Sequence, residues 1–197
     1  MQGGVKKILL LLANGFEILE ASAFIDVIGW NLFEGDYSTQ LHSAGISKEI
    51  KSSFNQKFTV DYLIEQINID SFDALAIPGG FKEFNYYEDA YSDVFLNTIR
   101  SFKVLNKPIA SVCVGALPIA KSGILKNKKG TTYNSPDYRN TLKEYGVDVL
   151  DEPIVIDDNI ITSHGPSTAI DVAFILLGKL TSYENVKSVK KLMGFEF

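Results

Sequence analysis

Cysteine, histidine and tryptophan are scarce in this sequence of 197 residues, which holds one cysteine, two histidines and one tryptophan. A single cysteine cannot form an intramolecular disulfide, and no Cys/His cluster with metal-ligand spacing is present to hold zinc. We therefore expect no metal and no organic cofactor. The cytoplasm, where thiols stay reduced, is the predicted compartment.

An excess of positive charge and a long apolar run are also missing. The chain has 19 Lys and Arg against 24 Asp and Glu, a net charge of -5, so no basic field favours nucleic acid or an anionic membrane. The apolar run at residues 8–13 is too short to span a bilayer, and no signal-peptide cleavage pattern follows it. These features predict no nucleic-acid partner, no membrane insertion and no export.

The composition is that of an ordinary globular protein, with 46% hydrophobic and 22% charged residues. No linker, composition shift or internal repeat divides the chain, so we expect one domain over residues 1–197. Short apolar runs alternate with stretches of helical periodicity. The expected strands lie at residues 6–13, 37–45, 72–80, 107–112 and, as two strands, 154–163, with a further extended stretch at 52–61. The expected helices lie at residues 17–30, 62–68, 89–102, 115–123, 137–146, 166–180 and 183–195.

Alternation of strands and helices predicts an α/β fold with a doubly wound, mostly parallel sheet and helices on both faces. Such sheets bind ligands at the carboxyl ends of their strands. Four turns follow predicted strands and should converge there: "ANGFEILE", "PGGF", "VCVG" and "SHGPST". Between them they supply a thiol, carboxylates, two adjacent glycines and a histidine.

Cys113 lies where a buried strand meets a helix, in the stretch Ser-Val-Cys-Val-Gly. This layout resembles a nucleophile elbow, although Ser111 stands where the best-known elbow has glycine. A helix N-terminus favours thiolate over thiol and lowers the pKa of cysteine from its usual value of about 8.5. From spacing alone Cys113 is either a packed core thiol or a nucleophile.

The Pro-Gly-Gly turn brings flexible backbone to the same edge of the sheet. Without side chains to block approach, Gly79 and Gly80 could expose backbone N–H groups. The N–H groups of Gly80 and Val114 together would form an oxyanion hole. The alternative is a simple turn with no catalytic role.

Two glutamates, Glu17 and Glu20, open the first predicted helix. Glutamates are common at helix starts because they cap the helix and favour its dipole. Apolar neighbours give Glu20 a second interpretation, since burial would raise its pKa and keep it protonated as a donor to the sulfur of Cys113.

The turn "SHGPST" carries His164, Gly165 and Pro166 at the end of a predicted strand. His164 is the imidazole that this position brings nearest to the predicted site, although a capping or packed histidine is the ordinary alternative. We assign no role to the other histidine, His42, which we expect on a strand.

Five segments, taken together, resemble the DJ-1/PfpI (ThiJ-like) superfamily over nearly the whole chain, and its DJ-1 branch most closely. They are "ILLLLANGFEILEASAFIDVI", "FDALAIPGGF", "KPIASVCVGALPIAKSGIL", "KKGTTY" and "ITSHGPSTAIDVAFILLGKL". The resemblance implies a flavodoxin-like (Rossmann-like) fold, a homodimer and a reactive elbow cysteine, Cys113. It further implies that Glu20 hydrogen-bonds the sulfur and that Gly80 and Val114 are backbone donors.

One position departs from the family pattern. Many members place a histidine beside the cysteine in the stretch that reads "GTTY" here, and this chain has Tyr133 at that position. A tyrosine, with an ordinary pKa of about 10, is a poor general base at neutral pH, although it can donate a hydrogen bond. A Cys–His dyad of the peptidase type is therefore not supported. We hypothesise that His164 partly substitutes for the missing base.

The resemblance and the residues together favour a cysteine-centred protein that takes a small molecule or an oxidant. Cys113 would attack a reactive carbonyl, as in glyoxalase or deglycase activity, or would sense oxidants by forming a sulfinate. Two alternatives stay open. One is an amidase or peptidase type of cysteine hydrolase, and the other is a chaperone or interaction module without catalysis.

Overall fold

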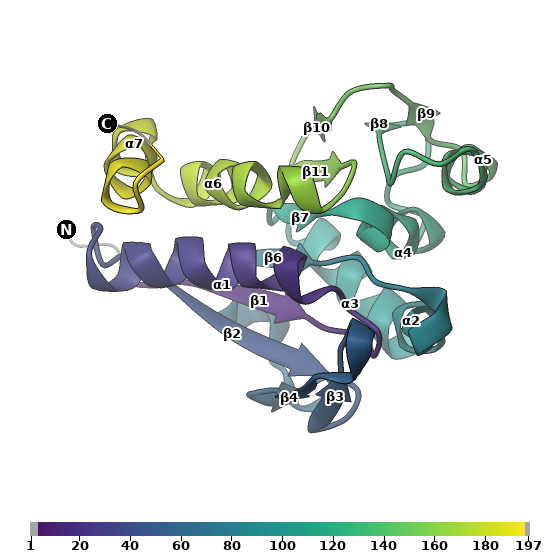
Figure 1. Ribbon diagram of the computed structural model, residues 1–197, viewed down its shortest axis with the longest axis horizontal. Helices are drawn as coiled ribbons and strands as arrows, with labels where there is room; N and C mark the ends of the chain where they lie inside the picture. Colours follow the sequence, from purple (N-terminus) through teal and green to yellow (C-terminus); the bar gives the residue numbers. More distant parts are fainter. Residues whose placement is uncertain (1–3, 196–197) are drawn as a thin grey trace.

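The computed structural model describes residues 4–195 and centres on a seven-stranded sheet with the order β10-β11-β7-β6-β1-β2-β5 (Figure 1). All neighbours pair in parallel except β10 and β11, which form an antiparallel hairpin. Parallel strands covered on both faces read as continuous apolar runs, as "ILLLL" does here. The strands are β1 (Lys6–Leu11), β2 (Thr39–Gly45), β5 (Tyr62–Leu63), β6 (Ala74–Ile77), β7 (Ile109–Ser111), β10 (Ile154–Asp157) and β11 (Ile160–Ser163).

Helices cover both faces of this sheet. Helices α1 (Ile18–Phe33), α6 (Ala169–Leu180) and α7 (Tyr183–Leu192) pack against one another, and Figure 1 shows α1 and α6 side by side. Helix α3 (Asp93–Val104) covers the other face. The connection β1→β2, which contains α1, and the connection β6→β7, which contains α3, run in opposite directions along the sheet. Because both connections are right-handed, their helices lie on opposite faces. The remaining helices are α2 (Tyr86–Ala90), α4 (Ala116–Lys121) and α5 (Pro136–Glu144).

The parallel strand order is that of a flavodoxin-like doubly wound sheet, which confirms the predicted fold class. The connections reverse direction between β1 and β6, so the carboxyl ends of these two strands and of β7 meet at the switch point. This is the edge at which the sequence places the turns after residues 11, 77 and 111.

Several short elements lie outside the main sheet. Strands β3 (Glu49–Lys51) and β4 (Lys57–Thr59) form a small antiparallel hairpin, and β8 (Lys129–Gly130) pairs in parallel with β9 (Asp148–Val149). Single 3₁₀ turns connect many of the elements. They are η1 (Ser53–Asn55), η2 (Ile64–Gln66), η3 (Ile69–Ser71), η4 (Lys82–Phe84), η5 (Cys113–Gly115) and η6 (Pro166–Thr168).

Three expected elements differ from the structure. Residues 62–68 do not form a helix, because Tyr62–Leu63 pairs with the free edge of β2 and only a 3₁₀ turn follows. The helix expected at 89–102 is broken at Ser92, whose hydroxyl accepts the N–H of Phe95 and starts α3 anew. The extended stretch at 52–61 contains the turn η1 before β4.

A continuous apolar core lies between the sheet and its helices. Within residues 4–195, none of the helices has the length and apolar character needed to cross a membrane.

Candidate active site

Cys113 begins the turn η5, two residues after the end of β7, as the elbow pattern predicts. Its φ is 56°, in the left-handed region that non-glycine residues rarely adopt and that costs on the order of 1–3 kcal/mol. The buried hydroxyl of Thr132 donates to the carbonyl oxygen of Cys113 at 3.0 Å. The surrounding structure therefore holds this residue in a strained conformation, which is typical of functional positions.

The turns after β1 and β6 are joined by two backbone hydrogen bonds. Glu17 N–H donates to Gly79 O at 2.9 Å, and Phe81 N–H donates to Gly15 O at 3.0 Å. Gly79 also abuts the elbow, since a Cβ at this position would lie 2.9 Å from Cys113 Cβ and 3.0 Å from Val114 N. Only a residue without a side chain fits where these turns meet.

Glu20 is fully buried behind the elbow. Its Oε2 accepts the N–H of Gly79 at 2.6 Å, while its Oε1 has no hydrogen-bond partner among the described residues. Burial, and secondarily the charge of Glu17, raises the pKa of Glu20 to about 8, although the Gly79 N–H and the Cys113 thiol act in the opposite direction. The carboxyl is therefore protonated at neutral pH. Because Oε2 is an acceptor, the proton belongs on Oε1.

The thiol of Cys113 is nearly covered, with 7% of the residue exposed. Burial raises the pKa of this thiol above its ordinary value, and nearby Glu20 raises it further, whereas the N–H of Val114 lowers it. The expected lowering by a helix N-terminus is thus outweighed, because α4 has only six residues and the surroundings are apolar. Cys113 rests as a thiol and needs a base before it can attack.

A cavity of about 320 Å³ opens in front of the thiol. Two aromatic rings of its wall, Tyr133 and Tyr138, stand edge to face with centroids 6.1 Å apart. Glu17 also faces the cavity, and partial burial raises the pKa of its carboxyl. The lining residues are Glu17, Gly80, Phe81, Cys113, Val114, Tyr133, Tyr138 and Pro166.

Most of the predicted site residues gather here. Gly80, Val114, Tyr133 and Pro166 line the cavity with Cys113. Behind this lining, Glu20 and Gly79 are bonded to each other. Gly165, directly before the turn η6, lies close to Tyr133, whose ring would be 3.6 Å from a Cβ at position 165.

His164 is not among the residues that line the cavity. Its backbone N–H donates to Pro153 O at 2.9 Å, and its Nε2 is buried with no hydrogen-bond partner in the described part of the chain. The cavity wall therefore presents phenol groups where the hypothesis expected an imidazole.

Three residues of the site have no role in the sequence-based prediction: Phe81, Thr132 and Tyr138. Phe81 and Thr132 adjoin predicted positions, so the turn sequences "GGF" and "TTY" could have indicated them. Tyr138 lies on α5, and nothing in its local sequence indicates that it faces the elbow. Within residues 4–195, no cluster of three or more His, Cys, Asp or Glu side chains could hold a metal ion.

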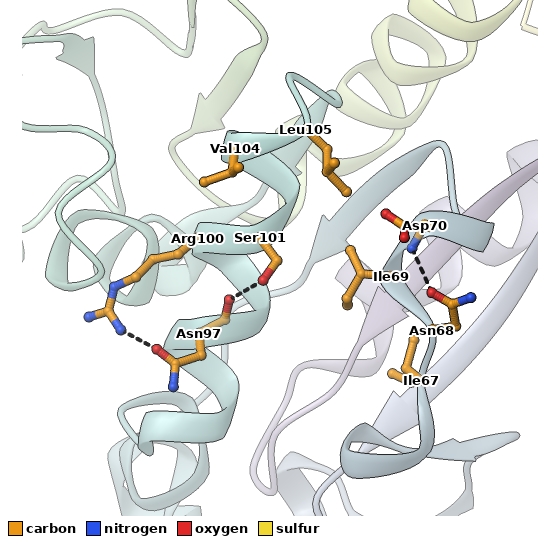
Figure 2. Close-up of a pocket in the computed structure, with 9 residues that line it drawn as sticks. All are labelled: Ile67, Asn68, Ile69, Asp70, Asn97, Arg100, Ser101, Val104 and Leu105. Carbon is orange, nitrogen blue, oxygen red and sulfur yellow. Dashed lines mark hydrogen bonds between the residues drawn. The ribbon is translucent and has the colours of Figure 1, made fainter.

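A second and larger cavity, of about 580 Å³, lies at the opposite edge of the sheet. Figure 2 shows it as a groove between the end of α3 and the segment that precedes β6. We call it the amino-edge groove, because both elements lead into the amino ends of strands β6 and β7. It is lined by Ile67, Asn68, Ile69, Asp70, Asn97, Arg100, Ser101, Val104 and Leu105.

The fold and the site define a flavodoxin-like α/β protein with a strained elbow cysteine and a buried acid beside it. Comparison with known proteins agrees, since the family model described as "DJ-1/PfpI family" matches residues 6–179. The chain belongs to the DJ-1/PfpI family.

Individual relatives are distant. The chain is 28% identical to protein DJ-1 homolog B of Arabidopsis thaliana over 95% of its own length but spans only 41% of that protein. It is 28% identical to deglycase PfpI of Pyrococcus furiosus, covering 81% of this chain and 90% of the relative. The crystal structure of Drosophila melanogaster DJ-1beta superposes with a TM-score of 0.84 at 28% identity, over 96% of this chain and 97% of that one.

Proposed function

We propose that this protein converts small 2-oxoaldehydes to 2-hydroxy acids by a glyoxalase-type reaction at Cys113. The observation that carries the proposal is a covered, strained thiol facing a cavity of about 320 Å³, with the buried carboxyl of Glu20 behind it. The relative named a deglycase supports an activity toward reactive carbonyls within the family.

The first step is addition of the thiol to the aldehyde carbon. The S–C bond forms, the π electrons of the carbonyl move to oxygen, and the N–H groups of Gly80 and Val114 stabilise the oxyanion. Because Glu20 already carries a proton, it acts as a relay: it takes up the thiol proton and gives its own to Glu17, the half-buried carboxylate that faces the cavity. The oxyanion takes up a proton, which gives a hemithioacetal.

The second step moves a proton from the aldehyde carbon to the neighbouring ketone carbon. This isomerisation oxidises the first carbon to a thioester and reduces the second to an alcohol, so no external oxidant or reductant is needed. Water then hydrolyses the thioester, releases the 2-hydroxy acid and restores the thiol. The carboxyl pair is the proton carrier in this scheme.

Carbonyl addition fits the site better than the other candidate functions. Both carbonyl addition and oxidation start from the thiolate, so the raised pKa of Cys113 does not separate them. The cavity of about 320 Å³ is larger than a small oxidant needs and favours a carbonyl substrate. Amide hydrolysis needs a base that later protonates an amine. Tyr133, and not an imidazole, lines the cavity at the corresponding position.

The direct test is incubation of the purified protein with methylglyoxal. We expect the 2-hydroxy acid to accumulate and intact-mass measurement to detect a hemithioacetal on the wild-type chain. Cys113→Ser should lose both signals, with at least about a thousandfold fall in kcat/KM. Val104→Ser, an exposed change in the amino-edge groove, is the matched control and should behave as wild type. Equal activity of wild type and Cys113→Ser would refute the proposal.

We also propose that the chain forms a homodimer. Support comes from helix α1, which leaves Leu19, Trp30 and Phe33 exposed, because apolar surface of this kind favours association. Light scattering coupled to size exclusion tests the proposal, and a monomer at micromolar concentration would contradict it.

A further inference from the structure

We infer that the cavity at Cys113 selects uncharged 2-oxoaldehydes that carry an aromatic substituent. This inference rests on the proposed function and deepens it. It depends on three features of the cavity: the aromatic rings that line it, the sign of the charge that faces it, and its size.

Three separate segments contribute aromatic rings to the lining. Phe81 comes from the turn after β6, Tyr133 from the loop after β8, and Tyr138 from α5. Phe81 and Tyr133 remain 38% and 46% exposed, so their rings are partly uncovered at the cavity. Partly exposed aromatic surface in a concave site is a common mark of an apolar ligand.

The rings are held in defined positions. Tyr133 and Tyr138 form the edge-to-face pair at 6.1 Å, and the ring of Phe81 packs against Phe54 at 5.7 Å and Phe84 at 6.5 Å between centroids. An incoming aromatic ring can add to such an arrangement by offset stacking or by another edge-to-face contact. An alkyl group as small as methyl gains little from it.

The charge facing the cavity is negative. Glu17 is the one carboxyl in the lining, and no Lys, Arg or His is found among the lining residues of the described chain. An anionic substrate would meet this carboxylate without a compensating cation, which costs binding energy in a partly desolvated site. The cavity therefore disfavours 2-oxoaldehydes that carry a carboxylate, such as 4-carboxyphenylglyoxal.

The volume also favours a ring. A cavity of about 150 Å³ is large enough to bind benzene. The cavity here has about 320 Å³, which accommodates a phenyl group together with two carbonyls. Methylglyoxal would leave most of this space to water and would forgo the burial of apolar surface that a phenyl group provides.

The test compares phenylglyoxal, methylglyoxal and the anionic 4-carboxyphenylglyoxal as substrates of the wild-type protein. Each kcat/KM is divided by the rate constant for addition of N-acetylcysteine to the same aldehyde, which removes differences in intrinsic reactivity. We expect the value for phenylglyoxal to exceed the values for methylglyoxal and for 4-carboxyphenylglyoxal by about tenfold or more each.

Variants of Tyr133 identify the origin of the preference. Tyr133→Ala should reduce the ratio of phenylglyoxal to methylglyoxal to near one, whereas Tyr133→Phe, which keeps the ring, should retain it. Val104→Ser, far from the cavity, should leave the ratio unchanged. Equal normalised values for the two aldehydes in wild type, or an unchanged ratio in Tyr133→Ala, would overturn the inference while leaving the proposed function intact.

A second measurement does not depend on turnover. Alkylation of Cys113 by iodoacetamide is followed in the presence of acetophenone or acetone, which are unreactive ketones of matching shape. Acetophenone should protect the thiol at concentrations about tenfold lower than acetone. Protection without any turnover would support the selection and contradict the proposed reaction, and equal protection by both ketones would overturn the selection itself.

Discussion

The amino-edge groove and the cavity at Cys113 lie at opposite edges of the sheet, and they differ in the bonding of their polar groups more than in their volume. The amino-edge groove is the larger, with about 580 Å³ against about 320 Å³ for the cavity at Cys113. Its polar side chains on α3, however, are bonded within that helix: Arg100 donates to Asn97 Oδ1 at 2.6 Å, and Ser101 Oγ donates to Asn97 O at 3.0 Å (Figure 2). None of the side-chain atoms that are buried and unpaired in the described residues lies in this groove.

The cavity at Cys113 has the opposite character. Glu20 Oε1 is buried without a hydrogen-bond partner among the described residues, and Cys113 is held at a positive φ. Buried polar atoms are nearly always paired, so an unpaired one beside a strained thiol is a cost that folding alone does not explain. Strain and unsatisfied polar atoms distinguish a reactive site from a surface hollow better than size does.

The strongest test of the difference between the two cavities is to remove the exchangeable proton of Glu20. In Glu20→Gln the amide oxygen can still accept the Gly79 N–H, and the side chain stays neutral, but it cannot exchange a proton with the thiol. We expect kcat/KM for 2-oxoaldehydes to fall by about a hundredfold or more. Steady-state assays measure this, with Asp70→Asn in the amino-edge groove as the matched carboxyl-to-amide control.

The control should retain wild-type kinetics, because Asp70 is exposed and remote from the thiol. If Glu20→Gln loses less than about twofold, the carboxyl acts only as a hydrogen-bond donor and proton transfer belongs to another group.

The same carboxyl should make the free energy of unfolding depend on pH. Its pKa rises from 4.5 to about 8 on folding, so between these values the folded state binds more protons than the unfolded state. The stability that this group contributes is complete below pH 4.5 and is lost as pH rises through about 8. The expected slope reaches about 1.4 kcal/mol per pH unit.

Urea unfolding between pH 5 and 8 measures the slope, and Glu20→Gln is the control. The variant should lose most of the dependence and keep the smaller contribution of Glu17, whose pKa is also raised by burial. Parallel slopes in the two proteins would mean that Glu20 ionises normally in the folded state.

Much of the fold could be predicted because its signals are local. Continuous apolar runs indicated the buried parallel strands, and Gly123 and Gly146 marked helix ends where the backbone does adopt a positive φ. Strand β5 could not be predicted, since its two residues are a strand only by virtue of the open edge of β2. Pairing partners distant in sequence leave no local pattern.

The residues of the site also divide into those with a local sequence signal and those that depend on packing between distant segments. Cys113, Gly80 and Glu20 were predictable, because a parallel sheet brings the turns after its strands to one edge. Tyr138 and the resting protonation of the thiol were not, since both depend on how α5 and the surrounding apolar groups pack around the elbow. Burial raises the pKa of the thiol by more than a short helix lowers it. The helix can be predicted from the sequence, whereas the extent of burial cannot.

The smallest expected effect tests how tightly the turns meet at the elbow. In Gly79→Ala the new Cβ would lie 2.9 Å from Cys113 Cβ and 3.0 Å from both Val114 N and Glu20 Oε2, so the elbow must shift. We expect a loss of about 1–3 kcal/mol in the free energy of unfolding, measured by urea denaturation, together with reduced activity.

The matched control is Gly29→Ala on α1, where a new Cβ meets no atom within 4 Å beyond the adjacent backbone of its own helix. Alanine in a helix interior should stabilise the protein by about 0.5–1 kcal/mol and leave activity unchanged. The two substitutions should therefore change the free energy of unfolding in opposite directions, because Gly79 lies in close contact with other turns and Gly29 does not. If Gly79→Ala is as stable and active as wild type, the elbow has room to relax, and the strain at Cys113 does not depend on its contact with the turn after β6.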